Sequence, residues 1–466
     1  MEWPAYLDEY EKLVIRMNTP KVVIDNAVCP TATLVKVTSR SSAFVRFFCG
    51  SNGNRQQVDS ASRKHGVLLE AIHVLTDLNL SVKKAYISYD GRWFMDVFHV
   101  TDQFGNKLTD DSVISYLEQS LDTGNPEINR SHRCEGLTPL ELTGTDRPGL
   151  LSEVFAVLAD LQCDVVEATV WTHNGRVACI LFLKDQLSGS HLDDAQKIHR
   201  IESRLRHVLK GDHGVRSGKT AVTSMAVAHP DSRLHQLMLA DRDYERGPSA
   251  PVSSTFVSVQ NWDERGYSVV NVQCRDRPKL LFDIVWTLTD MQYVVFHGTI
   301  DTDGDSAHQE FYIRHKNGSP IDSEAERHRV IQCLQAAIER RASEGTRLEL
   351  CIEDRPGLLS DVTRTFRENG LLVTRAEAST KGDMASDVFY VTDAAGQAAE
   401  PKAIEAVRLR IGFDHLKVKE EQRPRFCRKE STDREASLGG VGTGLFYLGS
   451  LVRRNLYNLG LIKSCS

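Results

Sequence analysis

Several familiar marks of a functional class are missing from this sequence. No run approaches the roughly 20 apolar residues of a membrane-spanning helix, and the opening MEWPAYLDEYEKL carries acidic residues where a secretory signal would be apolar. The ten cysteines are scattered without a CxxC pair, so neither a zinc site nor a disulfide framework is indicated. We therefore expect reduced thiols and a cytoplasmic or nuclear location, or both.

Positive charge is also in short supply. The chain has 57 Lys and Arg against 63 Asp and Glu, which gives a net charge of −6 at pH 7. That balance provides no positive field for a phosphate backbone, so we expect no nucleic-acid partner. Because 466 residues exceed what one hydrophobic core usually serves, the chain should instead divide into several domains.

Catalytic signatures are missing as well. The 16 histidines show no HExxH or triad-like spacing, and Asp212-His213 and Asp414-His415 stand as isolated pairs. A metal-dependent hydrolase would need further ligands beside each pair. We therefore predict a chain that is not an enzyme, with no catalytic residue, no metal site and no cofactor.

The sequence contains one internal repeat in four copies. The copies read SRKHGVLLEAIHVLTDLNL from Ser62, TDRPGLLSEVFAVLADLQC from Thr145, RDRPKLLFDIVWTLTDMQY from Arg275 and EDRPGLLSDVTRTFRENGL from Glu353. Aligned on Gly66, Gly149, Lys279 and Gly357, they also share a small residue, a turn glycine, a phenylalanine and a closing glycine further along. Agreement over this length predicts four tandem modules. The shared positions are Ala85, Ala168, Gly298 and Ala376; Gly91, Gly175, Gly304 and Gly382; Phe98, Phe182, Phe311 and Phe389; and Gly105, Gly189, Gly318 and Gly396.

Each copy alternates between strand and helix patterns. Leu140 and Leu142 alternate with polar residues as in a half-buried strand, and the apolar residues after the motif fall at helical spacing. A second helix is clearest over 195–209 and 324–341, and a last short strand over 221–227 and 416–419. The order is βαββαβ, so we predict an α+β fold of ferredoxin-like modules in which the apolar stripes and the shared phenylalanines form the cores.

A module of this order whose first turn reads DRPGLL resembles the ACT domain. Four such units, together with the stretch SRLHQLMLADRDYE at 232–245, resemble the plant ACT-domain repeat family. The resemblance implies modules paired side by side and a non-catalytic regulatory sensor that binds amino acids or similar small metabolites. One alternative is a protein–protein interaction scaffold without a small-molecule ligand. Another is the regulatory remnant of a uridylyltransferase-like enzyme, because ACT modules also end a bacterial enzyme of that kind.

The expected boundaries follow from the repeats. Only one strand-like stretch, 347–352, separates the second helix of the third copy from the fourth copy, which leaves the last strand of module 3 open. The predicted parts are an N-terminal extension at 1–30, module 1 at 31–125 with an insertion at 38–57, module 2 at 137–228, a linker at 229–264, module 3 at 265–342, module 4 at 346–420, and a charged and apolar C-terminal tail at 421–466.

The strand-to-helix turn is the predicted ligand site. A helix N-terminus suits a carboxylate, glycine lets the backbone approach a ligand, and the aspartate could receive an ammonium group. A competing interpretation makes each aspartate a helix N-cap, with Pro148 or Pro356 in the first turn. The first copy lacks the Asp and Pro and the third has Lys279 for Gly. If only two modules bind a ligand, we therefore expect them to be modules 2 and 4, with modules 1 and 3 as structural partners. The candidate residues are Asp146, Arg147, Gly149, Leu150 and Leu151, and Asp354, Arg355, Gly357, Leu358 and Leu359.

Two segments interrupt the pattern. Residues 38–57 separate the first strand of module 1 from its helix. One interpretation is a retained intron or gene-model error, and the other is a genuine loop that blocks or reshapes the site of module 1. We favour the first, because long structureless loops inside compact domains are rare. The apolar end of the tail, around Arg453-Arg454, fits an amphipathic segment that docks on the modules, on a partner or, least favoured, on a membrane surface. Self-association through the modules is also expected, and the protein partner stays unknown.

Overall fold

The computed structural model describes residues 21–40, 60–89, 93–122, 136–210, 218–222, 229–245, 255–342 and 345–419. Within them the strands form two antiparallel sheets. The first sheet has the order β1 (Lys21–Asp25), β2 (Thr33–Arg40), β4 (Trp93–Thr101), β3 (Ser81–Tyr89), β11 (Tyr293–Asp303), β12 (Ser306–His315), β10 (Tyr267–Arg275), β9 (Phe256–Trp262). The second has the order β16 (Leu416–Lys419), β13 (Thr346–Glu353), β15 (Met384–Thr392), β14 (Leu372–Lys381), β6 (Cys163–His173), β7 (Arg176–Asp185), β5 (Thr138–Thr145), β8 (Lys219–Val222).

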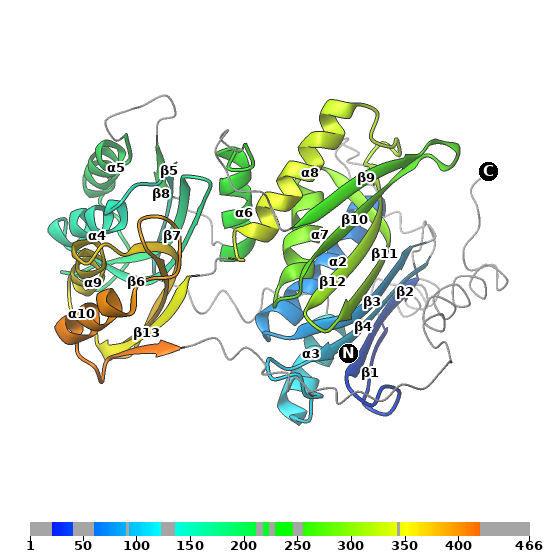
Figure 1. The fold of residues 1–466 in the computed structure, drawn as a ribbon, viewed down its shortest axis with the longest axis horizontal. Helices are drawn as coiled ribbons and strands as arrows, with labels where there is room; N and C mark the ends of the chain where they lie inside the picture. The colour runs from blue at the N-terminus through cyan, green and yellow to red at the C-terminus, as the bar shows by residue number, and fades with distance from the viewer. Residues whose placement is uncertain are drawn as a thin grey trace, which may run out of the picture.

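Each sheet joins two modules edge to edge, as Figure 1 shows. Modules 1 and 3 meet where β3 pairs with β11, and modules 2 and 4 meet where β14 pairs with β6. The prediction of an α+β fold with ferredoxin-like modules paired side by side is therefore confirmed. The pairing lies within one chain, since one sequence provides both members of each pair.

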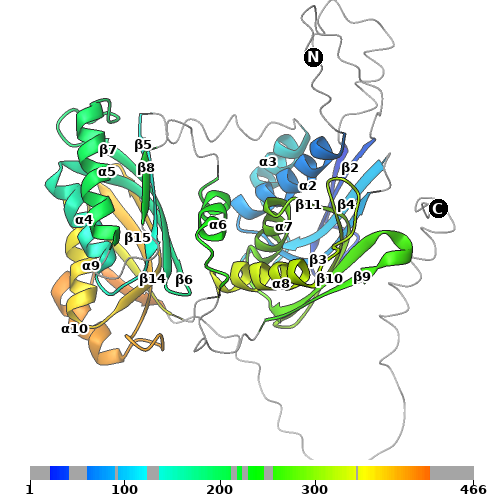
Figure 2. The same cartoon turned by 90° about the horizontal axis from the view of Figure 1, so that it is seen from above.

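Helices cover one face of each sheet, because their apolar stripes need a surface to bury against. Figure 2 shows the resulting layers: the helices of the second sheet, that sheet, a single helix α6 (Pro230–Ala240), the helices of the first sheet, and the first sheet. Over the described ranges no helix combines the length and the apolar character needed to cross a membrane. The first sheet carries α2 (Ser60–Asp77), α3 (Asp111–Asp122), α7 (Leu280–Asp290) and α8 (Glu324–Glu339), and the second carries α4 (Leu150–Asp160), α5 (Ala195–Lys210), α9 (Leu358–Glu368) and α10 (Pro401–Ile411).

The phenylalanine expected in every core is present in three modules only. Phe98, Phe311 and Phe389 are fully buried beneath the helices, each opposite the small residue of its neighbouring strand. In module 2 the residue paired with Ala168 is Leu181, and Phe182 points to the opposite face. The shared-phenylalanine alignment of module 2 is therefore wrong by one residue, and a shift of one residue turns a strand side chain to the other face.

The edge strands differ between the two pairs. In modules 2 and 4 the last strand follows the second helix and pairs with the first strand, as β8 pairs with β5 and β16 with β13. In modules 1 and 3 the corresponding edge is supplied from before the module, by β1 and β9. This explains why the third copy has one strand-like stretch too few. It also places β1 in the predicted N-terminal extension and β9 in the predicted linker.

The predicted linker also contains α6, which packs on the face of the second sheet that the other helices leave open. Leu234 and Met238 of α6 contact a cluster made by Trp171, Ile180 and Phe182. Because β7 is covered on both faces, eight consecutive residues of this strand are buried. The stretch SRLHQLMLADRDYE therefore holds the two halves of the molecule together. The inserted segment and the tail fall almost entirely outside the described residues, so both interpretations of each stay predictions.

Candidate ligand site at the turn of module 4

The strand-to-helix turns of modules 2, 3 and 4 share one backbone geometry. Gly149, Lys279 and Gly357 precede the helices with φ of 83°, 65° and 78°, in the left-handed region that favours glycine. These residues are the N-caps, and the N-cap interpretation of the aspartates is wrong. The backbone N–H groups of Asp146 and Asp354 instead donate at 2.8 Å to the hairpin carbonyls of Gly175 and Asp383, which holds each aspartate at the strand end.

The prolines lie outside the helices as well, because each stands before the left-handed N-cap residue rather than in the first turn. Because the N-caps of α4 and α9 are glycines, neither provides a side-chain hydrogen bond to the first helical turn. First-turn N–H groups without an intrahelical acceptor are the usual binding site for a carboxylate or phosphate at a helix end.

The arginine of the motif clamps each turn to its own module. Arg147 pairs with Glu153, Arg277 with Asp283 at 2.7 Å, and Arg355 with Asp361 at 2.5 Å, so the acidic partner always lies six residues further on. In modules 2 and 3 the guanidinium also donates to the end of the second helix, to the carbonyls of Val208 at 3.3 Å and Ile338 at 2.7 Å. Two of the predicted ligand residues, Arg147 and Arg355, therefore already have carboxylate partners.

The turn of module 4 borders a cavity of about 220 Å³. The five predicted residues of this turn line one side, and the end of α4 with the beginning of β6 lines the other, so the cavity crosses the seam between modules 4 and 2. The corresponding cavities at the turns of modules 2 and 3 measure about 30 and 20 Å³. Since a single water needs about 10–15 Å³ on this measure, those two have room for a water or two. From the opposite module the lining residues are Phe155, Ala159, Cys163, Asp164, Val165 and Lys184.

Charges of both signs surround the open cavity. Asp354 accepts a hydrogen bond of 2.9 Å from the hydroxyl of Thr380. Partial burial raises the pKa of Asp164, and Lys184 partly offsets this shift by lowering it. Asp354 also raises the pKa of Asp164, so the carboxylates of Asp164 and Asp354 lie close enough to repel each other. Behind them, burial raises the pKa of Asp387 to about 7. A cationic group placed between Asp164 and Asp354 would relieve this repulsion.

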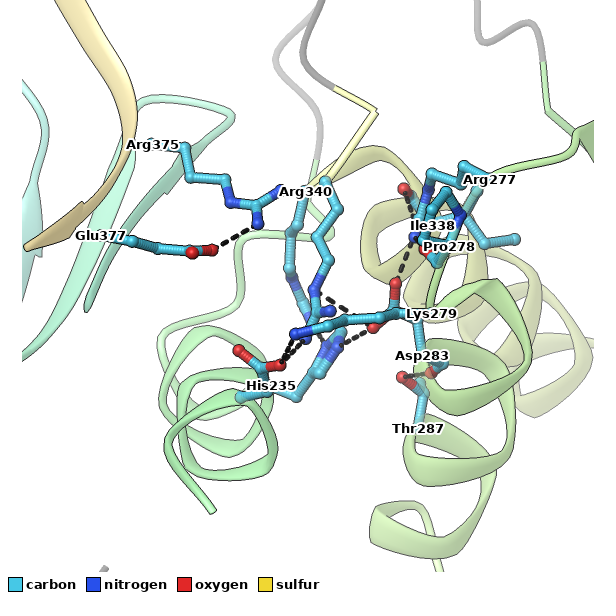
Figure 3. A network of polar contacts seen from close by, with 12 residues as sticks. His235, Arg277, Pro278, Lys279, Asp283, Thr287, Ile338, Arg340, Arg375 and Glu377 are labelled. Atoms are coloured by element: carbon cyan, nitrogen blue, oxygen red, sulfur yellow. Dashed lines mark hydrogen bonds and ion pairs between the residues drawn. The ribbon is translucent and has the colours of Figure 1, made fainter. Parts of the chain in front are cut away.

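The turn of module 3 is engaged in a different contact, shown in Figure 3. Lys279 and Arg341 each approach Asp231, in the first turn of α6, at 2.9 Å. Burial opposes ionisation of Asp231, but Arg341 and Lys279 hold its pKa far below the usual range. Arg375 and Glu377 of β14 pair with each other and approach the same cluster from the second sheet. This turn thus joins α6 to module 3, in agreement with a structural role for that module.

A buried chain of polar contacts continues behind this turn (Figure 3). Arg340 binds Asp243 through two hydrogen bonds of 2.6 Å and contacts His235 Nδ1 at 2.7 Å, while His235 Nε2 lies 2.7 Å from Asp283. Sequence reasoning missed this network. Its only sequence signal is the charged end of the 232–245 stretch, and the partners of those residues lie far along the chain.

In module 1 no comparable turn exists among the described residues, because α2 begins at Ser60 and Gly66 lies inside it. The predicted ligand residues thus gather at two places, five around the closed cavity of module 2 and five around the open cavity of module 4. Whether either set binds a ligand stays a prediction. Elsewhere in the described ranges, no three His, Cys, Asp or Glu side chains gather as metal ligands would.

Comparisons with known proteins agree with this architecture. The model of the ACT domain matches residues 140–200 and 346–408, that of the ACR family N-terminal ACT domain matches 52–127, and that of an ACR9-like, ACT-like domain matches 256–342. A bifunctional uridylyltransferase/uridylyl-removing enzyme of Rhodospirillum rubrum is 24% identical over 204 residues, which are 43% of this chain but 20% of the enzyme.

Relatives from Arabidopsis thaliana are similar over their full length. The ACT domain-containing protein ACR8 is 59% identical and covers 100% of both chains, and the ACT domain-containing protein ACR4 is 50% identical and covers 98% of both. Identity at this level over whole chains, with ACT or ACT-like models on all four modules, shows the family. The chain belongs to the plant family of ACT domain-containing ACR proteins.

Proposed function

We propose that this protein is a non-catalytic regulatory sensor that binds a free amino acid at the seam between modules 4 and 2. The observation that carries the proposal is the cavity of about 220 Å³ at the turn of module 4, which is much larger than the cavities of about 30 and 20 Å³ at the turns of modules 2 and 3. A cavity of this size with charged groups in its lining favours a small-molecule ligand over a scaffold that uses protein surfaces alone. The uridylyltransferase alternative loses support because the match covers a small part of that enzyme.

The chemistry of the cavity fits the two charged groups of an amino acid. The N-terminus of α9 offers first-turn N–H groups and the positive end of a helix dipole to the ligand carboxylate. Asp164 and Asp354 offer their carboxylates to the ammonium group, and Phe155, Ala159 and Leu359 provide apolar surface for a side chain. Each module supplies part of the site, so ligand binding would stabilise the pair.

Thermal unfolding with each of the twenty free amino acids tests this proposal. A ligand at 100 times its dissociation constant stabilises the native state by about 2.7 kcal/mol, which should raise Tm by several degrees. Asp354→Asn should abolish the rise. Asp146→Asn, the same change in the closed cavity of module 2, is the matched control and should leave the rise intact.

If none of the twenty amino acids raised the Tm of well-folded protein, the amino-acid site would be disproved and the scaffold alternative favoured. A rise that survives Asp354→Asn but is lost in Asp146→Asn would place the ligand at the wrong turn and refute the assignment to module 4. The cytoplasmic or nuclear location and self-association through the modules remain predictions, for which fractionation and sedimentation are the direct measurements.

A further inference from the structure

Modules 2 and 4 form a pair with nearly exact internal symmetry. Along the seam, Ala376 pairs with Val170, and their counterparts Ala168 and Ala378 pair in the same way. Both seam strands also carry their bulge at the same step, after Val165 in one and after its counterpart in the other. Helix α4 packs on α9 across the same axis. Such a pair should contain two equivalent ligand sites, one at each turn.

The two turns are nevertheless unequal, and one position accounts for the difference. The residue that faces Gly357 from the opposite module is Ala159, whose Cβ lies 3.9 Å from where a Cβ on that glycine would stand. The counterpart of Ala159 in module 4 is Arg367. Its Cδ lies so close to Gly149 that a Cβ added there would overlap it, and its Nη1 lies 3.4 Å from the same point.

From this we propose that Arg367 acts as a built-in occupant of the second site, so that the pair of modules 2 and 4 binds one ligand instead of two. The stem of Arg367 lies over the N-terminus of α4, where the carboxylate of a ligand would bind if the amino-acid site proposed above is correct. Arg367 lines the cavity of about 30 Å³, whereas its counterpart Ala159 lines the cavity of about 220 Å³.

The charges around Arg367 keep it in place while leaving it able to move. Arg147 and, less strongly, Arg367 hold the pKa of Glu153 below its usual value, so the arginine lies within the field of that carboxylate. Arg367 itself is exposed. An exposed side chain that is only attracted by a carboxylate already paired with Arg147 can leave its place at low cost, which makes the second site latent rather than lost.

The remaining lining of the latent site predicts a different preference. Where the open cavity has Cys163 and Asp164, the closed one has Leu371 and Leu372. Without the second carboxylate, the latent site keeps Asp146 alone for an ammonium group. Its ligand should therefore bind more weakly than at the open site or carry a more apolar side chain.

Calorimetric titration of the full chain with each of the twenty amino acids measures the number of sites directly. Wild type should bind one equivalent, Arg367→Ala two, Ala159→Arg none, and the double variant one. Arg364→Ala, which removes an exposed arginine of the same helix paired with Glu368 at 2.8 Å, is the control and should stay at one equivalent. Circular dichroism and Tm of each variant confirm that it is folded.

The outcomes separate the two proposals. If no amino acid binds wild type, the site at module 4 is disproved. If Arg367→Ala then binds one equivalent, the role of Arg367 stands on its own, and if Arg367→Ala binds none either, that role is overturned as well. If wild type binds one equivalent and no amino acid gives a second with Arg367→Ala, the occupant role is overturned. Full binding by folded Ala159→Arg would likewise overturn the claim that this position decides whether a turn is open.

Discussion

The contact between Arg340 and Asp243 offers the sharpest test of how α6 and module 3 are held together. Both side chains are almost fully buried, at 1% and 0% exposed, and two hydrogen bonds of 2.6 Å join them. Removing one partner of such a pair leaves an uncompensated buried charge, which typically costs 3–5 kcal/mol. We predict a loss of this size in the free energy of unfolding for Arg340→Met.

The pair itself should contribute far less than that loss. Two ions taken out of water lose about as much hydration energy as they regain by attraction, so an apolar replacement of both is often neutral. We therefore expect Arg340→Met combined with Asp243→Leu to recover most of the stability lost in Arg340→Met. The contact of Arg340 with His235 is lost in both variants, which sets a remaining deficit of about 1 kcal/mol.

Urea unfolding followed by far-UV circular dichroism measures each variant. Arg327→Ala is the control, because Arg327 lies on α8, the helix that Arg340 follows as C-cap, and pairs at 2.6 Å with Glu324, whose side chain is 83% exposed. An exposed pair contributes about 0.2–1 kcal/mol. If Arg340→Met cost no more than this control, Arg340 and Asp243 would have to be solvated, and the account of α6 as a buried connection between the halves would be wrong.

Three further predictions concern stability. Burial raises the pKa of Asp96 from 3.8 to about 7. Since the folded protein then holds this proton more tightly than the unfolded chain, ionisation of Asp96 costs stability as pH rises from about 4 to 7, and Asp96→Asn should gain stability relative to wild type over that window in urea titrations at each pH. The Lys279→Gly variant should be more stable than the Lys279→Ala variant by about 1 kcal/mol, because both variants lose the contact with Asp231 but only alanine is strained by the positive φ at this position. Equal urea midpoints for the two variants would contradict this. Met238→Ala should cost 2–5 kcal/mol by emptying the fully buried space against Trp171, and a cost below 1 kcal/mol would place α6 loosely on the sheet.

The repeat and the element order could be predicted because they depend on local patterns, whereas the pairing of modules was implied by the resemblance to the ACT domain. Apolar stripes after each motif and a small residue opposite each core phenylalanine recur at fixed steps, and both express packing inside a single module. The predicted second helix at 324–341 and the last strand at 416–419 lie where α8 and β16 are found.

The edge strands and α6 could not be predicted in the same way. An edge strand pairs with one neighbouring strand only, so the chain before the module or the chain after it can provide this strand. Nothing in the sequence of module 3 indicates that β9, before the module, takes this place instead of a strand after α8. Helix α6 has a weak pattern of its own because it is covered on two sides, by Trp171 of the second sheet and by the buried charges of Asp283 and Arg340. Its position depends on contacts about 50 to 100 residues away along the chain, which no local pattern records.

The strand-to-helix turns show why the sequence motif alone does not predict a binding site. Lys279 keeps the left-handed turn without glycine, and that turn contacts Asp231 of α6. Gly149 keeps the full DRPG motif, yet Arg367 of the opposite module covers it. Of the three described turns, the one that remains open is the one whose neighbour contributes Ala159. The motif therefore determines the shape of the backbone, whereas the space beside the turns of modules 2 and 4 depends on the residue that the opposite module places there.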